Sequence, residues 1–360
     1  MFNQPLIDQF GWEREDVDFT FSITIAVFAF TTIFAGKLQD VIGPRWVATI
    51  GGILLGIGLL LSSQATSLSQ LYFYYGVIGG IGIGMTYVCP LSACVKWFPD
   101  KRGFISGVAV AGFGLGGLIY KPIIEMLIEN FGVTSTFSYL GITYLILVVA
   151  GAQLLKNPPT EFELPSSPNS SVIPNAINFS TKEMLRTPQF YILWIMFLIG
   201  SMSGLLVISF AVDIGVELVN LDAGKAANAV MVIALFNAGG RIGLGKLSDR
   251  FGRKNTLLSV YALTAVILFF MSTGLMNYPL FLIAVSLIGF AFGGYLALYP
   301  SATADYYGTK NIGMNYGFMY QAYGISAFAG PFIIKLIPFT QAFIIFAILC
   351  LVAIIMGRFV

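Results

Sequence analysis

The chain has 360 residues, of which 57% are hydrophobic and only 10% are charged, and its formal net charge is +2. Soluble domains contain about 25% charged residues, so this composition excludes a soluble protein and indicates one that crosses a lipid bilayer many times. The small net charge gives no reason to expect a nucleic-acid partner. The sequence has no histidine, the usual metal ligand and proton shuttle. We therefore predict no metal, no cofactor and no enzymatic activity.

Apolar stretches long enough to span a bilayer occur eleven times. They cover about residues 18–36, 46–63, 70–93, 104–126, 134–155, 188–212, 225–245, 255–274, 279–302, 313–336 and 340–357. Residues 156–187 are polar and rich in proline and serine, which is typical of a linker. The chain is thus expected to form an N-terminal bundle of five spans (1–155), a linker (156–187) and a C-terminal bundle of six spans (188–360).

Basic residues are distributed unevenly between the loops. Loops and ends on one side of the predicted spans contain fourteen lysines and arginines, and those on the other side contain three. The positive-inside rule places the richer side, which includes the linker, in the cytoplasm. The N-terminus is then outside and the C-terminus inside. We expect a monomeric, multi-pass protein of the plasma (cell inner) membrane.

The sequence contains an internal repeat. GKLQDVIGPR at residues 36–45 recurs as GKLSDRFGRK at residues 245–254, an offset of 209. Two homologous halves are typical of transporters. Subtracting 209 from the span at 188–212 gives a position before residue 1, so the first span of the first half is missing. We expect a truncated start, and the alternative is a real arrangement of five plus six spans.

The repeated motif predicts a structural role at the loops. Gly43 and Gly252 allow tight turns, and Asp40 and Asp249 can accept hydrogen bonds near a helix N-terminus or pair with a cation. Ordinary solvated loops would not explain the duplication. We expect a gating motif that holds conformations and does not bind substrate, made of Gly36, Asp40, Gly43, Arg45, Gly245, Asp249, Gly252 and Arg253.

Arg241 lies within the apolar stretch at 225–245. An arginine in a membrane helix is costly, so it marks a functional site by default. Asn237 precedes Arg241 by four residues and projects from the same helix face. The alternative is an arginine that snorkels to the cytoplasmic interface near Lys246. We favour the site.

Other polar side chains extend this hypothesis. Tyr87, Tyr295 and Tyr299 lie beside Pro90 and Pro300 on helices expected to line a central cavity. They are candidates to hydrogen-bond a carboxylate, and routine packing is the alternative. Lys121 falls in the outer leaflet with Glu125 four residues later, which indicates either a Lys–Glu pair or an outer attractor for anions.

The pattern G-x-L-x-D-x-x-G-x-R, found twice at half-chain spacing, resembles the cytoplasmic loop motif of the major facilitator superfamily. Residues 81–117, residues 304–331 and the stretch NQPLIDQFGWEREDVDFTFS near the start resemble the oxalate/formate antiporter family and the related monocarboxylate transporters. The resemblance implies an all-α membrane protein with the major facilitator fold. That fold has two pseudo-symmetric helix bundles, and eleven of its twelve transmembrane helices are present here.

The resemblance implies an anion-binding role for Arg241. Relatives that handle oxalate carry a lysine in the eleventh helix, where this chain has Tyr323, with Gln321 close by. Proton-coupled monocarboxylate transporters carry an aspartate where Asn237 stands.

The sequence therefore predicts a secondary active transporter of small carboxylate anions that works by alternating access. Monocarboxylates such as lactate, pyruvate or formate are the expected substrates, because one guanidinium matches one carboxylate. A counter-anion or a proton is the expected coupled species. The alternatives are exchange of dicarboxylates of the oxalate/formate type, and a sensor or truncated remnant that does not transport.

Overall fold

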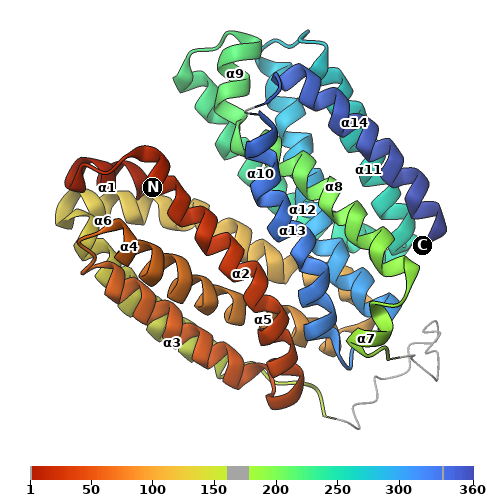
Figure 1. The fold of residues 1–360 in the computed structure, drawn as a ribbon. Coiled ribbons are helices and arrows are strands. Elements are labelled where there is room, and N and C mark those ends of the chain that lie inside the picture. The colour runs from red at the N-terminus through yellow and green to blue at the C-terminus, as the bar shows by residue number, and fades with distance from the viewer. Residues whose placement is uncertain (1, 160–177, 335) are drawn as a thin grey trace. The chain divides into compact units, whose positions relative to one another are not determined.

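The computed structural model of the chain describes residues 2–159, 178–334 and 336–360. Within these residues every regular element is a helix, which confirms the all-α prediction (Figure 1). The α-helices are α1 (Asn3–Phe10), α2 (Arg14–Ile42), α3 (Pro44–Ser62), α4 (Leu68–Leu71), α5 (Gly80–Trp97), α6 (Arg102–Ala152), α7 (Thr181–Met184), α8 (Pro188–Ser209), α9 (Ala211–Val219), α10 (Ala223–Phe251), α11 (Arg253–Ser272), α12 (Tyr278–Tyr307), α13 (Ile312–Ile334) and α14 (Phe339–Met356). A π-helix, η1 (Tyr72–Gly79), joins α4 to α5, and the 3₁₀-helices are η2 (Pro99–Lys101) and η3 (Gly357–Phe359).

Nine helices among the described residues are long and apolar enough to cross a membrane. One of them, which runs from η2 through α6, contains two of the predicted spans. Gly132 has a left-handed φ of 79° and breaks α6 between these spans. The predicted span at 313–336 coincides with α13, which is not among the nine. Asn315, Gln321 and several tyrosines lower the mean hydropathy of this helix.

The linker predicted over 156–187 lies partly outside the described residues, which resume at 178. The part that follows is hydrogen-bonded to the end of α12 and to the start of α13. The Phe179 N–H donates to the Tyr307 carbonyl at 3.0 Å, and the Thr181 hydroxyl donates to the Asn315 side chain at 2.7 Å. These hydrogen bonds join residues far apart in the sequence and hold the end of the linker before α8 begins.

The chain forms two compact units. Unit 1 comprises Met1–Trp97, Ile119–Thr181 and Tyr307–Gly324, and unit 2 comprises Phe98–Leu118, Lys182–Tyr306 and Ile325–Val360. Each unit takes one helical segment from the other half of the sequence, the first part of α6 in unit 2 and the first part of α13 in unit 1. The division at 155 and 188 that the repeat suggests stays a prediction.

Each unit has its own apolar core. Leu59, Leu71 and Phe137 belong to the core of unit 1, and Phe281 and Phe343 to that of unit 2. Local signals set the helix starts around these cores. At α10, for example, the Asp222 carboxylate accepts the Lys225 N–H at 2.9 Å, and this hydrogen bond lowers the pKa of Asp222 below its ordinary value.

Candidate functional site

Arg241 lies on α10 inside unit 2, and its side chain is almost completely buried, with 5% exposure. Its Nε donates to Asn237 Oδ1 at 2.7 Å, as their spacing of four residues predicts. Its Nη1 donates to the backbone carbonyl of Val110 on α6. A snorkelling arginine would extend into water, so this burial does not agree with the snorkelling interpretation.

Glycines let α10 approach its neighbours closely around the arginine. A Cβ atom at Gly114 of α6 would lie 2.9 Å from Arg241 Cζ, and one at Gly107 would lie 2.1 Å from the Arg241 carbonyl oxygen. On the other side, a Cβ at Gly293 of α12 would lie 2.1 Å from the Asn237 carbonyl oxygen. The guanidinium is therefore held between close-packed backbones, with its orientation fixed by Asn237 and Val110.

Unit 1 contains a cluster of aromatic side chains from three helices. Tyr87 of α5 is 8% exposed, and its ring centroid lies 5.3 Å from Phe28 of α2 and 5.0 Å from Tyr320 of α13. Tyr320 also stacks on Tyr323 at 4.9 Å and contacts Tyr316 at 5.6 Å. The predicted residues Tyr87 and Tyr323 are thus joined through Tyr320.

Sequence reasoning did not select Phe28, Tyr316 or Tyr320 for the site. A usable signal was present on α13, because residues 316, 320 and 323 follow the i, i+4, i+7 spacing of a single helix face. No comparable sequence signal connects Phe28 with these tyrosines, since α2 is apolar along most of its length.

Gln321, the other predicted residue on α13, fastens this helix to α2. Its Nε2 donates to the carbonyl oxygens of Ala29 at 2.7 Å and Gly317 at 2.8 Å. These bonds lie within unit 1 and connect two helix backbones.

Tyr295 and Tyr299 lie in the interior of unit 2, with exposures of 1% and 0%. The Tyr295 hydroxyl is 2.9 Å from the hydroxyl of Thr264, and the Tyr299 hydroxyl is 2.9 Å from that of Tyr261. Tyr261 in turn donates to the Met196 carbonyl. These contacts match the packing alternative, because both hydroxyls have partners in the core.

Lys121 Nζ lies 3.8 Å from Glu125 Oε1, and the two side chains are 60% and 52% exposed. This geometry is that of the predicted Lys–Glu pair. Exposed pairs of this kind contribute about 0–1 kcal/mol to stability.

The repeated motif places one aspartate at the N-terminus of a helix in each unit. Asp40 accepts the backbone N–H of Gly313 at 3.3 Å and of Met314 at 3.0 Å, at the start of α13. Asp249 accepts the N–H of Gly103 at 2.9 Å and of Phe104 at 2.8 Å, at the start of α6. The predicted hydrogen bonds near a helix N-terminus are confirmed, and the positive end of the helix dipole favours both carboxylates.

The motif glycines have the geometry that their positions require. Gly43 and Gly252 have φ angles of 89° and 86°, so the predicted tight turns are confirmed. A Cβ at Gly36 would lie 2.1 Å from the Gly313 carbonyl oxygen, and one at Gly245 would lie 2.3 Å from that of Gly103. Each glycine therefore allows two helix backbones to approach closely, next to the helix N-terminus that the motif aspartate caps.

The motif aspartates form ion pairs with different cations in the two units. In unit 1, Lys96 Nζ lies 3.4 Å from Asp40, and Arg45 instead donates to Gln153 at 2.7 Å. In unit 2, Arg253 lies 2.7 Å from Asp249 and 2.7 Å from Asp305. Arg102 joins the same network at 2.6 Å from Asp305. Unit 2 therefore has the more extensive ionic network.

Within the described parts of the chain, no group of three or more histidine, cysteine, aspartate or glutamate side chains could hold a metal ion.

Several known proteins are similar to this chain. The family model of the Major Facilitator Superfamily matches residues 1–331. The uncharacterized MFS-type transporter YhjX of Escherichia coli is 36% identical over 327 residues, which are 91% of this chain and 80% of that protein. The oxalate:formate antiporter of Oxalobacter formigenes is 31% identical over 365 residues, 100% of this chain and 86% of that protein. The crystal structure of the E. coli fucose:proton symporter matches with a TM-score of 0.74 at 17% identity, covering 99% of this chain and 93% of that one, and it supports the fold.

Proposed function

Since the chain belongs to the Major Facilitator Superfamily and is a multi-pass membrane transporter, we propose that its substrate is a small monocarboxylate anion such as lactate, pyruvate or formate. The buried guanidinium of Arg241, held by Asn237, is the observation that carries this proposal. A guanidinium can bind a carboxylate through two parallel N–H groups.

The charge of the site favours one carboxylate over two. An anion in a low-dielectric cavity is unfavourable unless a partner compensates its charge. Asn237 is neutral and places no negative charge at the Arg241 Nε–H. Lys121 is exposed and already paired with Glu125. A dianion would therefore leave one charge uncompensated at Arg241.

Substrate binding would compete with an existing contact. Arg241 Nη1 donates to the Val110 carbonyl, and a carboxylate is a stronger acceptor than a neutral carbonyl. Exchange of one acceptor for the other would loosen a contact between α10 and α6. Binding energy would thereby bias the equilibrium between conformations, as alternating access requires.

The Arg241–Asn237 pair contains neither a carboxylate nor an imidazole that could carry a coupled proton. This favours exchange for a counter-anion over proton coupling through the pair.

We propose the plasma membrane as the location.

A second candidate is exchange of the oxalate/formate type. The observation in its favour is the 31% identity, across the whole chain, to a protein named oxalate:formate antiporter. The two candidates differ in whether a dianion is bound better than a monoanion.

The test uses the full chain in proteoliposomes loaded with unlabelled formate. Uptake of labelled formate is measured with excess lactate, pyruvate, formate or oxalate outside. We expect the monocarboxylates to inhibit more strongly than oxalate. Stronger inhibition by oxalate than by every monocarboxylate would favour the second candidate.

Variants test the site itself. Arg241→Lys keeps the charge and loses the planar fork, so we expect uptake to fall about tenfold or more. Arg250→Lys, at an exposed position on the same helix, is the matched control and should leave uptake unchanged. Full uptake by Arg241→Ala would show that Arg241 does not bind the substrate.

A further inference from the structure

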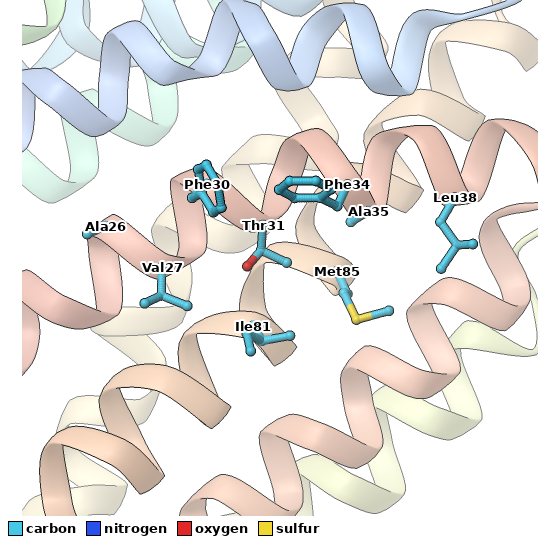
Figure 2. A pocket seen from close by; sticks show the side chains of 9 residues that line it. All are labelled: Ala26, Val27, Phe30, Thr31, Phe34, Ala35, Leu38, Ile81 and Met85. Atoms are coloured by element: carbon cyan, nitrogen blue, oxygen red, sulfur yellow. The ribbon is translucent and has the colours of Figure 1, made fainter.

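An apolar groove runs along unit 1 between α2 and α5 (Figure 2). Its volume is about 600 Å³, and Phe30, Phe34 and Leu38 of α2 line it together with Ile81 and Met85 of α5. Thr31 is the one polar side chain in the lining. A ligand for this groove must therefore be an apolar chain.

The groove opens on the side of α2 that its helix neighbours leave uncovered. Gly317 of α13 approaches Thr32, and Gly80 of α5 approaches Thr24. Phe30 and Phe34 project from another face of the same helix and are 60% and 59% exposed. They lie within a membrane-spanning segment, where an uncovered apolar face meets acyl chains.

The length of the groove matches one leaflet. Its lining on α2 extends from Ala26 to Leu38, which is about 18 Å at 1.5 Å per residue. One half of the bilayer core is about 15 Å thick. An acyl chain lying along α2 can thus fill the groove from the bilayer centre to the end of the helix.

A basic side chain, that of Lys37, lies at that end of the groove. Lys37 is exposed, and it follows Phe30 by seven residues and Phe34 by three, so it shares their helix face. Basic side chains at a membrane surface bind anionic lipid headgroups.

We propose that unit 1 binds an anionic phospholipid, with one acyl chain in the groove between α2 and α5 and the phosphate at Lys37. This site is independent of the proposed substrate.

The internal repeat allows the groove of unit 1 to be compared with the equivalent position in unit 2. With the offset of 209, Phe30, Thr31 and Phe34 correspond to Gly239, Gly240 and Gly243 of α10. In unit 2, α12 packs on Gly240 and Gly243, whereas Gly239 is exposed. A Cβ at Gly240 would lie 2.0 Å from the Phe290 carbonyl oxygen, and one at Gly243 would lie 3.8 Å from the Phe290 ring. An aromatic side chain of the protein thus packs where unit 1 has an open groove.

The experiment uses the full chain in proteoliposomes with two photoreactive lipids. Phosphatidylglycerol and phosphatidylcholine each carry a diazirine on one acyl chain, and labelled peptides are mapped by mass spectrometry. We expect phosphatidylglycerol to label residues 26–38 and 81–85 in preference to the exposed apolar faces of α3, α11 and α14. Even labelling over all these faces would overturn the proposal.

Variants separate the chain site from the headgroup site. Ile81→Trp fills the groove and should lower labelling there by both lipids, whereas Ile283→Trp, at a 55% exposed position of α12, should not. Lys37→Gln should lower labelling by phosphatidylglycerol about fivefold and leave phosphatidylcholine unchanged. Lys37 lies on the surface, so its variant keeps the test decisive if Ile81→Trp fails to fold. Unchanged phosphatidylglycerol labelling in Lys37→Gln would overturn the proposal.

Discussion

Asn237 is a neutral hydrogen-bond partner of Arg241 on α10. Its amide oxygen accepts the Arg241 Nε–H at 2.7 Å and adds no charge of its own. A carboxylate at this position would form an ion pair with the guanidinium and oppose the binding of a substrate anion.

We therefore expect Asn237→Asp to weaken substrate binding near neutral pH. Protonation of the new carboxyl would remove its charge, so binding should recover as the pH falls. The measurement is the KM for formate uptake between pH 5 and pH 8, compared with the parent protein. A KM that stays unchanged over this range in the variant would contradict the charge argument.

Gly114 leaves the space that the guanidinium occupies. A methyl group there would lie 2.9 Å from Arg241 Cζ, and the side chain would have to move. We expect Gly114→Ala to raise the KM about tenfold, which corresponds to a moderate overpacking cost, while the protein remains folded.

Gly112→Ala is the matched control, because a Cβ at Gly112 meets no atom within 4 Å. Equal KM values for the two variants, both monodisperse in size-exclusion chromatography, would show that space at Gly114 does not matter.

Residue by residue, the sequence predicts charge better than orientation. Arg241 and Asn237 were found because a cation in an apolar helix is rare. Tyr295 and Tyr299 are candidates on another ground, that tyrosine can hydrogen-bond a carboxylate, and both have core partners. Because α12 is apolar on nearly all sides, its sequence does not distinguish the core face from a cavity face.

At the scale of helices, the two motif aspartates connect the last turns of α2 and α10 to the N-termini of α13 and α6. Asp40 and Asp249 each accept two backbone N–H groups, and Asp249 lies about 12 Å along α10 from Arg241 at 1.5 Å per residue. We expect ties of this kind to select a conformation and to leave the ligand contacts as they are.

We expect Asp40→Asn and Asp249→Asn to lower the maximal transport rate about tenfold, because each loses hydrogen bonds to a charged acceptor, while the KM changes little. Asp100→Asn, at an exposed position of η2, is the control. The measurement is a full concentration series of formate uptake. A large rise in KM at unchanged maximal rate would assign the aspartates to substrate binding.

Helix boundaries show where hydropathy succeeds and where it does not. The motif glycines Gly43 and Gly252 predict the two tight turns, because only glycine readily adopts the positive φ that these turns require. The break in α6 also falls at a glycine, Gly132, between two predicted spans. In contrast, Asn315, Gln321 and the tyrosines lower the mean hydropathy of α13, so this helix is not among the nine candidate spans of the described residues, although the sequence predicts a span there.

At the scale of the whole molecule, the two halves of the sequence do not coincide with the two compact units. The repeat divides the sequence once, near the linker, whereas each compact unit includes a segment from both sides of that division. Sequence offsets identify equivalent residues, such as Asp40 and Asp249. They do not identify which helices pack together, because packing depends on side-chain shape and on contacts distant in sequence.

The distribution of basic residues predicts one orientation in the membrane. Residues near Glu13 should face the outside and residues near Lys254 the cytoplasm, because loops rich in lysine and arginine are retained on the cytoplasmic side. The test replaces Cys89, Cys94 and Cys350 by alanine and introduces Glu13→Cys or Asn255→Cys, both at exposed positions. A membrane-impermeant maleimide added to intact cells should label Glu13→Cys alone, and both variants after permeabilisation. Labelling of Asn255→Cys in intact cells, with Glu13→Cys protected until permeabilisation, would reverse the orientation and place Lys37 and the motif aspartates on the outer side.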